Sequence, residues 1–320
     1  MSTSYAEIGV KGKATAVPSV QIDGRTVIVT GKWLQTANVR DEELVEGEIT
    51  SDPAAFVEQL KQSGLRADVF TFAQKLPNSE PRFAYHQEWD NWAVIPVTTY
   101  SDWFEKRAES SVRRAVRKAA KSGVEVKVAP LDDAFVQGIV NINNETPVRQ
   151  GKAFWHYHKD PESVRQEHAT YPDRTSFLGA YYQGEMIGYL RVTFADRTAN
   201  IIQILSMMKH FDKRPTNALI AKAVEMCDEW QMSHLTYCNY VYNDADSSLT
   251  EFKRRSGFEQ ILLPRYYIPL TWKGEIALKI GIHHGIVKLL PKRLLKGLLA
   301  LRKYWYERKA TAPADGGTEQ

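Results

Sequence analysis

The stretch 247–267, SSLTEFKRRSGFEQILLPRYY, decides the fold because it passes from a helix to a strand across a single glycine. Residues 247–257 have the composition of a short basic helix, and Gly257 stands where a helix commonly ends in a left-handed residue. Phe258 then begins a β-rich run that contains two prolines. We interpret the stretch as the joint between the last helix and the last strand of a domain, with Phe258 returning to its core.

The segments before this joint predict a mixed α/β order. Residues 132–145 and 161–169 are predicted helices, and residues 175–194 form two apolar-rich runs around Gln183-Gly184, a pair typical of a hairpin turn. Two further predicted strands, 199–208 and 234–242, flank a helix at 214–230. Because a strand joined through a helix to the next strand favours parallel neighbours, we expect one sheet that splits at this crossover.

The N-terminal half has a similar mixture of strands and helices. It predicts a strand at 27–30, a helix begun by Asp52 and Pro53, and strands within 67–74 and 92–97. The segment 102–122 is the clearest helix of the chain, with one basic face and one narrow face of small residues. The first hundred residues are therefore expected to be α/β as well.

Composition bounds the class of protein. A chain of 320 residues with 43% hydrophobic and 25% charged residues is ordinary globular material, long enough for two domains. The net charge of +4 is too small to imply nucleic acid by itself. The two cysteines, Cys227 and Cys238, lack the spacing of a disulfide framework or a zinc site, and no run of 18 apolar residues occurs. We expect a cytoplasmic protein, at most peripheral at the inner face of the membrane.

Four motifs carry a family resemblance. The hairpin YYQGEMIGYLRV (181–192), the helix start DKRPTNALIAKAVEMC (212–227) and the joint LTEFKRRSGF (249–258), together with the basic helix end RRAVRKAAKSGVEVKV (113–128), stand in an order that resembles the Fem-type, two-unit branch of the GNAT acyltransferase superfamily. The resemblance covers roughly residues 20–272. It implies an α/β fold of two tandem GNAT-like units with mixed sheets, followed by a C-terminal amphipathic helix.

The resemblance also implies domain boundaries. We expect a disordered tail at 1–19, a degenerate GNAT-like unit at 20–129 that includes the basic helix 102–122, and a complete catalytic unit at 130–272. A basic amphipathic segment at 273–309 and a disordered tail at 310–320 would follow. The part of that segment at 288–309 could dock on the catalytic unit or lie on an anionic membrane.

Proteins of this kind transfer an acyl or aminoacyl group to an amine, mainly by positioning the two substrates. We expect an acyl-CoA-type donor as co-substrate and an amino sugar or lipid-linked, cell-surface precursor as acceptor, which would place the protein in envelope or polysaccharide biosynthesis. Aminoacyl-tRNA and acyl-carrier protein are alternative donors. A non-catalytic module that binds an anionic partner or a membrane is the alternative from another class. No metal is expected.

The donor-binding residues come from a motif that departs from the family pattern. Acyl-CoA-binding relatives carry a glycine-bearing turn at the start of this helix, but this chain reads DKRPTNA, and its proline lacks an N–H group. A phosphate could still be bound there by the residues Lys213, Arg214, Thr216 and Asn217.

The expected catalytic residues are Lys253, Glu145, His156 and Tyr240. Lys253 belongs to a Phe-Lys pair that Fem-type proteins also carry, and it would stabilise the oxyanion; otherwise it is a solvated charge. Glu145 or His156 would deprotonate the amine, although a local salt bridge for the glutamate and an ordinary hydrogen-bonded histidine remain alternatives. Tyr240 or Tyr242 could protonate the leaving group.

The expected substrate-binding residues lie in three places. Arg149 follows Glu145 by four residues in a loop, and Asn239 and Tyr242 lie at the end of a strand where open α/β sheets form their crevice. Arg113 and Arg117 belong to the basic face of helix 102–122 and could bind a phosphate-bearing substrate, or could form an ordinary solvated face. His156 and His158 would share a side of an extended backbone, but no third metal ligand is evident.

Overall fold

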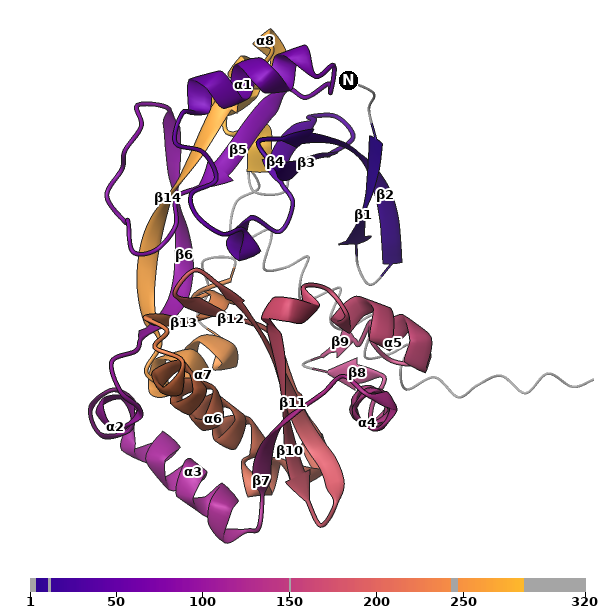
Figure 1. Cartoon of the computed structure of the whole chain (residues 1–320), viewed down its shortest axis with the longest axis vertical. Helices are drawn as coiled ribbons and strands as arrows, with labels where there is room; N and C mark the ends of the chain where they lie inside the picture. The colour runs from indigo at the N-terminus through magenta and orange to yellow at the C-terminus, as the bar shows by residue number, and fades with distance from the viewer. Residues whose placement is uncertain (1–3, 11–12, 150, 243–246, 285–320) are drawn as a thin grey trace, which may run out of the picture.

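The computed structural model describes residues 4–10, 13–149, 151–242 and 247–284, and these form one mixed sheet of twelve strands (Figure 1). The order across the sheet is β1-β2-β3-β4-β5-β14-β6-β13-β12-β11-β10-β7. The twelve strands are β1 Ser4–Val10, β2 Lys13–Ile22, β3 Arg25–Thr30, β4 Thr36–Val39, β5 Val69–Ala73, β6 His86–Pro96, β7 Glu125–Ala129, β10 Thr175–Tyr182, β11 Glu185–Ala195, β12 Thr198–Ser206, β13 His234–Asn239 and β14 Glu259–Pro269.

The helices cover both faces of this sheet. The α-helices are α1 Pro53–Gln62, α2 Tyr100–Asp102, α3 Ser110–Lys121, α4 Asp133–Asn143, α5 Pro161–His168, α6 Pro215–Glu229, α7 Ser248–Arg255 and α8 Trp272–Lys279. Short 3-10 segments are η1 Glu42–Leu44, η3 Pro172–Arg174, η4 Met208–Lys213 and η5 Ile282–His284, and a small ribbon pairs β8 Val148–Arg149 with β9 Lys152–Ala153.

Two units are visible in the sheet, one at each end (Figure 1). We define the first unit as β1–β5 with α1 and α8, and the second unit as β7 and β10–β13 with α3–α7. In the second unit, α6 packs on one face over a core that includes Leu190 and Leu219, while α4 packs on the other face with Phe135 against Phe177. The main cores of the two units are separate clusters of buried side chains.

The two units exchange strands at the centre of the molecule. Strand β14 follows the second unit in the chain but hydrogen bonds to β5 of the first, and β6 follows the first unit but pairs with β13 of the second. The two strands pair with each other along nine register positions, from Glu259↔Val94 to Tyr267↔His86. The expected boundary at residue 130 is therefore wrong in detail, because the sheet of each unit is completed by a strand from the other segment.

Several sequence expectations hold at the level of single elements. Asp52 caps α1 by accepting the N–H of Ala55, with Pro53 at the first helical position. The hairpin between β10 and β11 turns at Gln183 and Gly184, which have φ values of 51° and 83°, as a two-residue primed turn requires. Gly257 has a φ of 85° where α7 gives way to β14.

Other expectations are corrected. Residues 1–19 were expected to be a disordered tail, but β1 and β2 pair antiparallel from Ser4↔Ser19 to Val10↔Lys13. The single helix expected at 102–122 is broken into α2, a π-helical turn η2 at Trp103–Arg107, and α3, because Ala108 adopts an extended conformation. Strand β7, assigned to the first unit, pairs with β10 of the second. The segment 288–309 lies outside the described residues.

Each unit contains one parallel pair of strands that separates after a few residues. In the second unit β12 and β13 pair only from Thr198↔His234 to Asn200↔Thr236, so their carboxyl ends diverge. In the first unit β4 and β5 pair only from Thr36↔Val69 to Asn38↔Thr71. We call these the second split and the first split. Since a split exposes both sheet faces at the carboxyl ends of strands, these are the places to look for a site.

Candidate functional site

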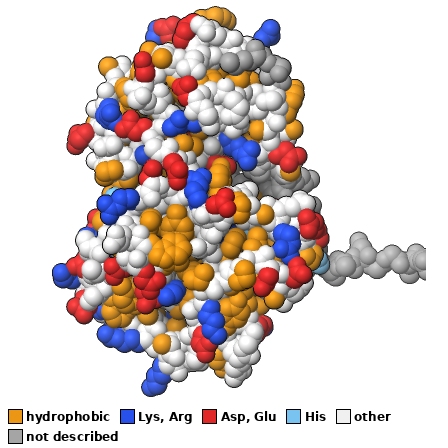
Figure 2. Space-filling view, in the orientation of Figure 1, with side chains coloured by type: hydrophobic (Ala, Val, Ile, Leu, Met, Phe, Trp, Pro, Cys, Tyr) orange, Lys and Arg blue, Asp and Glu red, His pale blue; other side chains and the backbone are white. Residues whose placement is uncertain are grey.

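The second split contains a cavity of about 380 Å³ between β12, η4, α6 and α7. Its walls are mainly apolar, with Ile204 and Leu205 from β12, Phe211 from η4 and Phe252 from α7. Figure 2 shows hydrophobic side chains gathered over this part of the second unit. The volume lies within the range of small-molecule sites, and an apolar lining suits an acyl or aminoacyl chain.

Helix α6 begins at this cavity without a side-chain cap. Arg214 occupies the N-cap position in a left-handed conformation, with φ 61° and ψ 40°, and its side chain is exposed to the cavity. Pro215 has no N–H group, and the N–H groups of Asn217 and Ala218 both donate to the carbonyl of Arg214. The backbone thus offers few donors for a compact pyrophosphate, and the positive group at this helix start is the guanidinium.

A second cavity of about 570 Å³ continues from Arg214 along α3. It shares Arg214, Asn217, Ser248 and Phe252 with the first cavity, so that the two form one groove. Exposed cations on its walls include Arg114 and Lys118 of α3, and among the described residues neither these nor Arg214 forms an ion pair. We call Arg114, Lys118 and Arg214 the basic triad of the groove.

The two arginines that the sequence singled out on α3 lie outside the groove lining. The guanidinium of Arg113 donates to the carbonyls of Glu105 at 2.9 Å and Ala108 at 2.7 Å, and so closes the end of the π-helical turn. Arg117 stacks over the ring of Phe104, 5.3 Å from its centre. Their neighbours one position along the helix, Arg114 and Lys118, line the groove instead.

Lys253 is the most unusual charge in the second unit, because its side chain is completely buried. Its ammonium donates to the carbonyls of Tyr237 at 2.8 Å and Asn239 at 2.6 Å, and lies over the rings of Tyr237 and Tyr242. Burial lowers the pKa of Lys253 to about 8. The solvated-charge alternative is thereby excluded, and Lys253 fastens α7 to the end of β13.

The residues at the end of β13 surround this lysine. Tyr242 covers its ammonium, and burial raises the pKa of Tyr242 to about 12, so the phenol keeps its proton at neutral pH. Asn239 is exposed and contributes its carbonyl, while the N–H of Tyr240 donates to the carbonyl of Asn91 on β6. The Cys238 thiol lies 4.0 Å from the carbonyl of Ile201, across the second split.

Glu145 and Arg149 form the half-buried ion pair that their spacing indicated, with 3.1 Å between Arg149 Nη2 and Glu145 Oε2. The carboxylate also accepts the N–H groups of Met208 and Lys209 at 2.7 and 2.8 Å. Arg149 lines the second split and donates to the carbonyl of Ser206 at the end of β12. These bonds make the pair an anchor for η4, and they occupy both oxygens of the proposed base.

The remaining residues predicted from the sequence lie apart from the groove or are already in contact with other side chains. His156 is buried in a turn, where burial lowers its pKa to about 4 and keeps it neutral. Because this segment is a turn, the expected extended arrangement with His158 does not occur. Lys213 pairs with Asp212 and stacks on Tyr182, and the Thr216 hydroxyl lies 3.0 Å from that of Ser206.

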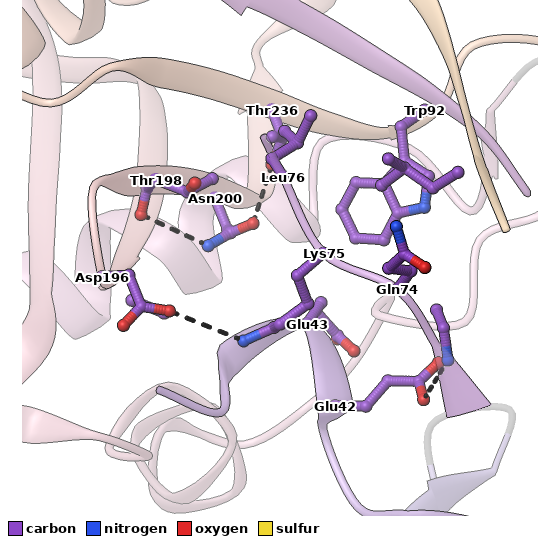
Figure 3. Close-up of a pocket in the computed structure, with 13 residues that line it drawn as sticks. Glu42, Glu43, Gln74, Lys75, Leu76, Trp92, Asp196, Thr198, Asn200 and Thr236 are labelled. Carbon is purple, nitrogen blue, oxygen red and sulfur yellow. Dashed lines mark hydrogen bonds and ion pairs between the residues drawn. The ribbon is translucent and has the colours of Figure 1, made fainter. Parts of the chain in front are cut away.

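The first split holds a third cavity, with room of only about 40 Å³ (Figure 3). Lys75 projects into it, donates to the carbonyl of Val45 and lies 3.9 Å from Asp196 of the second unit. Burial lowers the pKa of Lys75. Glu43 lines the cavity wall, and desolvation raises the pKa of its carboxyl group. Desolvation also raises the pKa of the Cys238 thiol, and the charge of Glu43 adds to that rise.

Sequence reasoning missed this cavity and, on α3, singled out Arg113 and Arg117 in place of Arg114 and Lys118. Glu43 and Lys75 come from separate loops of the first unit, and Asn200 and Thr236, which share a 2.8 Å hydrogen bond at its floor, come from the second. Only the strand exchange at β6 and β14 places these segments together. The one local signal was the break before α3, since Glu109-Ser110-Ser111 is a weak helix interior.

The chain resembles known proteins in structure rather than in sequence. No protein-family model and no curated protein sequence matches the chain. Among solved structures, FemX matches with a TM-score of 0.53 and 10% identity, covering 82% of this chain and 88% of that one. The chain has the two-unit GNAT fold of FemX. The expected fold class is thereby confirmed.

Two further structures share this fold. L-PGS from Bacillus licheniformis matches with a TM-score of 0.53 and 13% identity, covering 80% of this chain and 85% of that one. The C-terminal domain of a putative lysylphosphatidylglycerol synthetase from Agrobacterium fabrum matches with a TM-score of 0.53 and 12% identity, covering 82% and 87%. At such identities the likeness is one of fold, so the function of this FemX-like chain rests on its own groove.

Within the described residues, no helix combines the length and the apolar character needed to cross a membrane.

Proposed function

We propose that this chain is an aminoacyl- or acyltransferase whose donor is held in the groove by the basic triad, and that the donor is an aminoacyl-tRNA. The observation that carries the proposal is the continuous groove from the second split, past the uncapped start of α6, to Arg114 and Lys118 on α3. Separate cations along a groove suit the spaced phosphates of a nucleic-acid strand, whereas a pyrophosphate is better served by clustered N–H groups. FemX and L-PGS are the structural neighbours that favour this donor over acyl-CoA.

The second split would place the reacting end of the donor. An aminoacyl ester in the cavity would rest on Ile204, Leu205 and Phe252, with its phosphodiester strand leading out past Arg214. The amine of the acceptor attacks the ester carbonyl, so that a C–N bond forms and the bond to the 3′ oxygen of the tRNA breaks. That oxygen leaves as a hydroxyl after taking a proton, and the amine gives one up. Positioning the two groups supplies most of the required rate enhancement.

Lys253 would contribute to this step without contacting the substrate. Its ammonium lies beneath Tyr237, a residue of the cavity wall, and fixes the carbonyls at the end of β13. A buried positive charge close to the cavity stabilises negative charge that develops on the carbonyl oxygen, because little water screens it. Lys253 is in this proposal a positioning residue with an electrostatic effect, and its Phe-Lys pair matches the Fem-type pattern noted in the sequence.

Glu43 is proposed to accept the amine proton through intervening water, because its cavity and the cavity of the second split have no lining residue in common. Its side chain is exposed on the wall of the first-split cavity and its pKa is raised by the surrounding protein, which makes a better base than an anchored carboxylate. Glu145, the residue expected from the sequence, has both oxygens engaged by Met208, Lys209 and Arg149. The acceptor would be an amine on a glycan or a lipid-linked precursor, which enters from the first unit.

The test compares the two donors directly. Full-length protein is titrated with fluorescent tRNA at several salt concentrations, and its unfolding midpoint is measured with and without acetyl-CoA. We expect tRNA binding that weakens steeply with salt and no stabilisation by acetyl-CoA. Stabilisation by acetyl-CoA without tRNA binding would replace this donor by acyl-CoA, the second candidate. A Glu43→Gln protein that binds tRNA normally and retains full transfer activity would remove Glu43 from the mechanism.

A further inference from the structure

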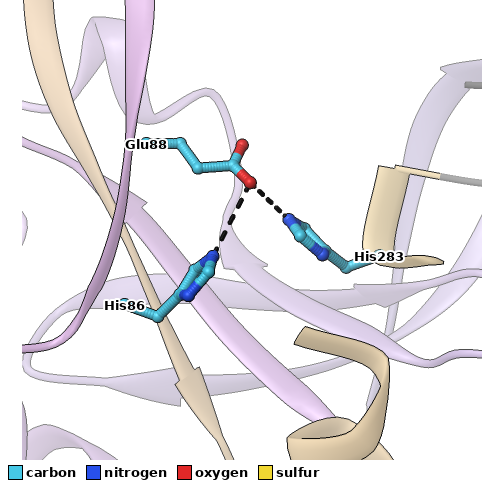
Figure 4. Close-up of side chains that lie close together, drawn as sticks. All are labelled: His86, Glu88 and His283. Atoms are coloured by element: carbon cyan, nitrogen blue, oxygen red, sulfur yellow. Dashed lines mark hydrogen bonds and ion pairs between the residues drawn. The ribbon is translucent and has the colours of Figure 1, made fainter. Parts of the chain in front are cut away.

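A cluster of two histidines and one glutamate lies outside the groove, at the joint between the first unit and the end of the described chain (Figure 4). His86 and Glu88 are two residues apart on β6, so their side chains leave the strand on the same side. His283 comes from η5, which follows α8 near the C-terminal end of the described residues. The strand and the 3-10 segment are almost 200 positions apart in the sequence, which is why the sequence indicated no such cluster.

The side-chain atoms of the cluster converge on one point. Nε2 of His283 lies 2.6 Å and Nε2 of His86 lies 3.7 Å from the same oxygen, Oε1 of Glu88. The potential ligand atoms of all three residues lie within 4.8 Å of one another. In a tetrahedral zinc site with bonds of about 2.0–2.1 Å, neighbouring ligand atoms stand about 3.4 Å apart. The 2.6 Å distance is shorter and the 3.7 Å distance is longer than that value. Small rotations of the side chains would therefore bring the ligand atoms to the spacing of a tetrahedral site.

The geometry points to a binding site for one zinc-class divalent cation, held by His86, Glu88 and His283. Two imidazole nitrogens and one carboxylate oxygen form a ligand set that zinc prefers, whereas magnesium and calcium prefer oxygen alone. A water molecule would take the fourth position. This proposal concerns a site separate from the groove, and it is independent of the proposed transferase function.

The surroundings preorganise half of the site and leave the other half accessible. The side chain of His283 is only 4% exposed, and its ring packs edge-on against Tyr267 with 4.8 Å between ring centres. The side chain of His86 is 41% exposed, so an ion can enter from solvent. A ligand fixed by packing together with one open side is the arrangement that a reversible metal site needs.

The position of the site indicates what the ion would do. Strand β6 is the element that completes the sheet of the second unit, and η5 follows the helix α8 that packs on the first unit through Leu278. A metal ion that bridges β6 and η5 would fasten the end of the described chain to the central strand pair. Because the ion binds only the folded arrangement, metal binding would also stabilise the fold.

The test uses full-length protein without a histidine tag, made metal-free with a chelator and titrated with Co²⁺ and then Zn²⁺. We expect one equivalent of Co²⁺ to give the visible absorption bands of a tetrahedral ion, displacement by one equivalent of Zn²⁺, and a raised unfolding midpoint. His86→Ala, at an exposed position, and Glu88→Ala should each weaken Zn²⁺ binding by more than about 100-fold, beyond the loss typical of outer-shell changes.

The matched control is His158→Ala, which removes an exposed histidine elsewhere and should bind Zn²⁺ as the unaltered protein does. His283→Ala is added with its circular-dichroism spectrum as a check on folding. Absence of a one-equivalent Co²⁺ spectrum would overturn the proposal. Equal Zn²⁺ affinity in the unaltered protein and the His86→Ala and Glu88→Ala variants would overturn it too, and would leave the cluster as an ion pair between side chains.

Discussion

The first and second splits have the same topology but differ in openness. In both, a strand leads through a helix to a parallel partner that pairs over three register positions and then diverges. The first split encloses about 40 Å³, whereas the second opens into cavities of about 380 and 570 Å³. The same fold element has thus been closed in one unit and opened as a groove in the other.

The starts of α1 and α6, the helices that follow β4 and β12, also differ. At α1 the carboxylate of Asp52 accepts the N–H of Ala55, so an anion already occupies the positive end of the helix. At α6 no side chain caps the helix, and Arg214 adds a positive charge there. A negatively charged donor is therefore attracted to the start of α6, which lies at the second split, and not to the start of α1.

Ion pairs and one half-buried lysine complete the closure of the first split. Arg265 of β14 binds Glu42 and Asp90, and Lys75 reaches the carbonyl of Val45. In the second split the equivalent inward charge is Lys253, which is turned away from the cavity toward the carbonyls of β13. Five predictions test this comparison, ordered from the largest expected effect to the smallest.

Removal of the basic triad should abolish the preference of a tRNA donor for the second split over the first. The variant Arg114→Ala/Lys118→Ala/Arg214→Ala loses three cations that face the groove, so tRNA affinity should fall on the order of 500-fold at 0.1 M salt, with a salt slope lower by about three. Fluorescence anisotropy measures both. The matched control, Lys32→Ala/Lys61→Ala/Arg66→Ala, removes three exposed cations from the first unit. Equal losses in the two variants would mean that the groove is not the binding surface.

Lys253 should make the stability of the protein depend on alkaline pH. Its folded pKa of about 8 lies below the usual 10.5, so between these values the unfolded chain binds more protons and the free energy of unfolding rises with pH. The rise should total roughly 3 kcal/mol relative to Lys253→Met, in which it is absent. Below pH 8 the two curves should run parallel. Denaturant unfolding of both proteins across this range measures the effect, and parallel curves throughout would contradict it.

Lys75→Met provides the matched comparison in the first split. Burial lowers the pKa of Lys75 as well, but Asp196 and Glu42 act in the opposite direction, so its pH-dependent contribution should have the same sign and a smaller size. If the pH-dependent change in the free energy of unfolding were larger for Lys75 than for Lys253, the more strongly buried charge would lie at the first split and not at the second.

Arg214→Gly should separate stability from binding at the start of α6. Arg214 has a φ of 61°, a left-handed conformation that costs a residue with a side chain about 1 kcal/mol and costs glycine little. The variant should therefore unfold at a higher temperature while binding tRNA less tightly. Thermal unfolding and anisotropy on the same protein measure both. A variant that loses stability and keeps its affinity would show that Arg214 serves the fold.

Asp52→Ala should have the smallest effect and only on stability. Loss of the cap of α1 should cost about 1 kcal/mol in the free energy of unfolding, and tRNA affinity should not change, because the first split is closed. Asp52→Asn, which can still cap the helix without the charge, is the control. A gain of tRNA binding at the first split in Asp52→Ala would show that the cap, rather than the closed cavity, excludes the donor.

The local elements could be predicted from the sequence because they depend on short-range signals. Asp52 and Pro53 begin α1, Gln183-Gly184 turns the hairpin, and Gly257 ends α7, each for reasons contained within a few residues. The family resemblance carried by the order and the motifs of these elements also implied the two-unit fold that FemX shares. For the site, the sequence identified Arg214 and Lys253 as the charges to examine, but not what surrounds them.

The rest depended on contacts between distant segments. The sequence alone determined elements such as α1, α6 and the β10–β11 hairpin, and that a split should follow β12, because chain order and turn chemistry are local properties. Only the tertiary structure decided that β6 and β14 change partners, that Arg114 and not Arg113 faces the groove, and that His86, Glu88 and His283 meet. The physical reason is that burial and side-chain direction are set by packing between elements, which no single segment encodes.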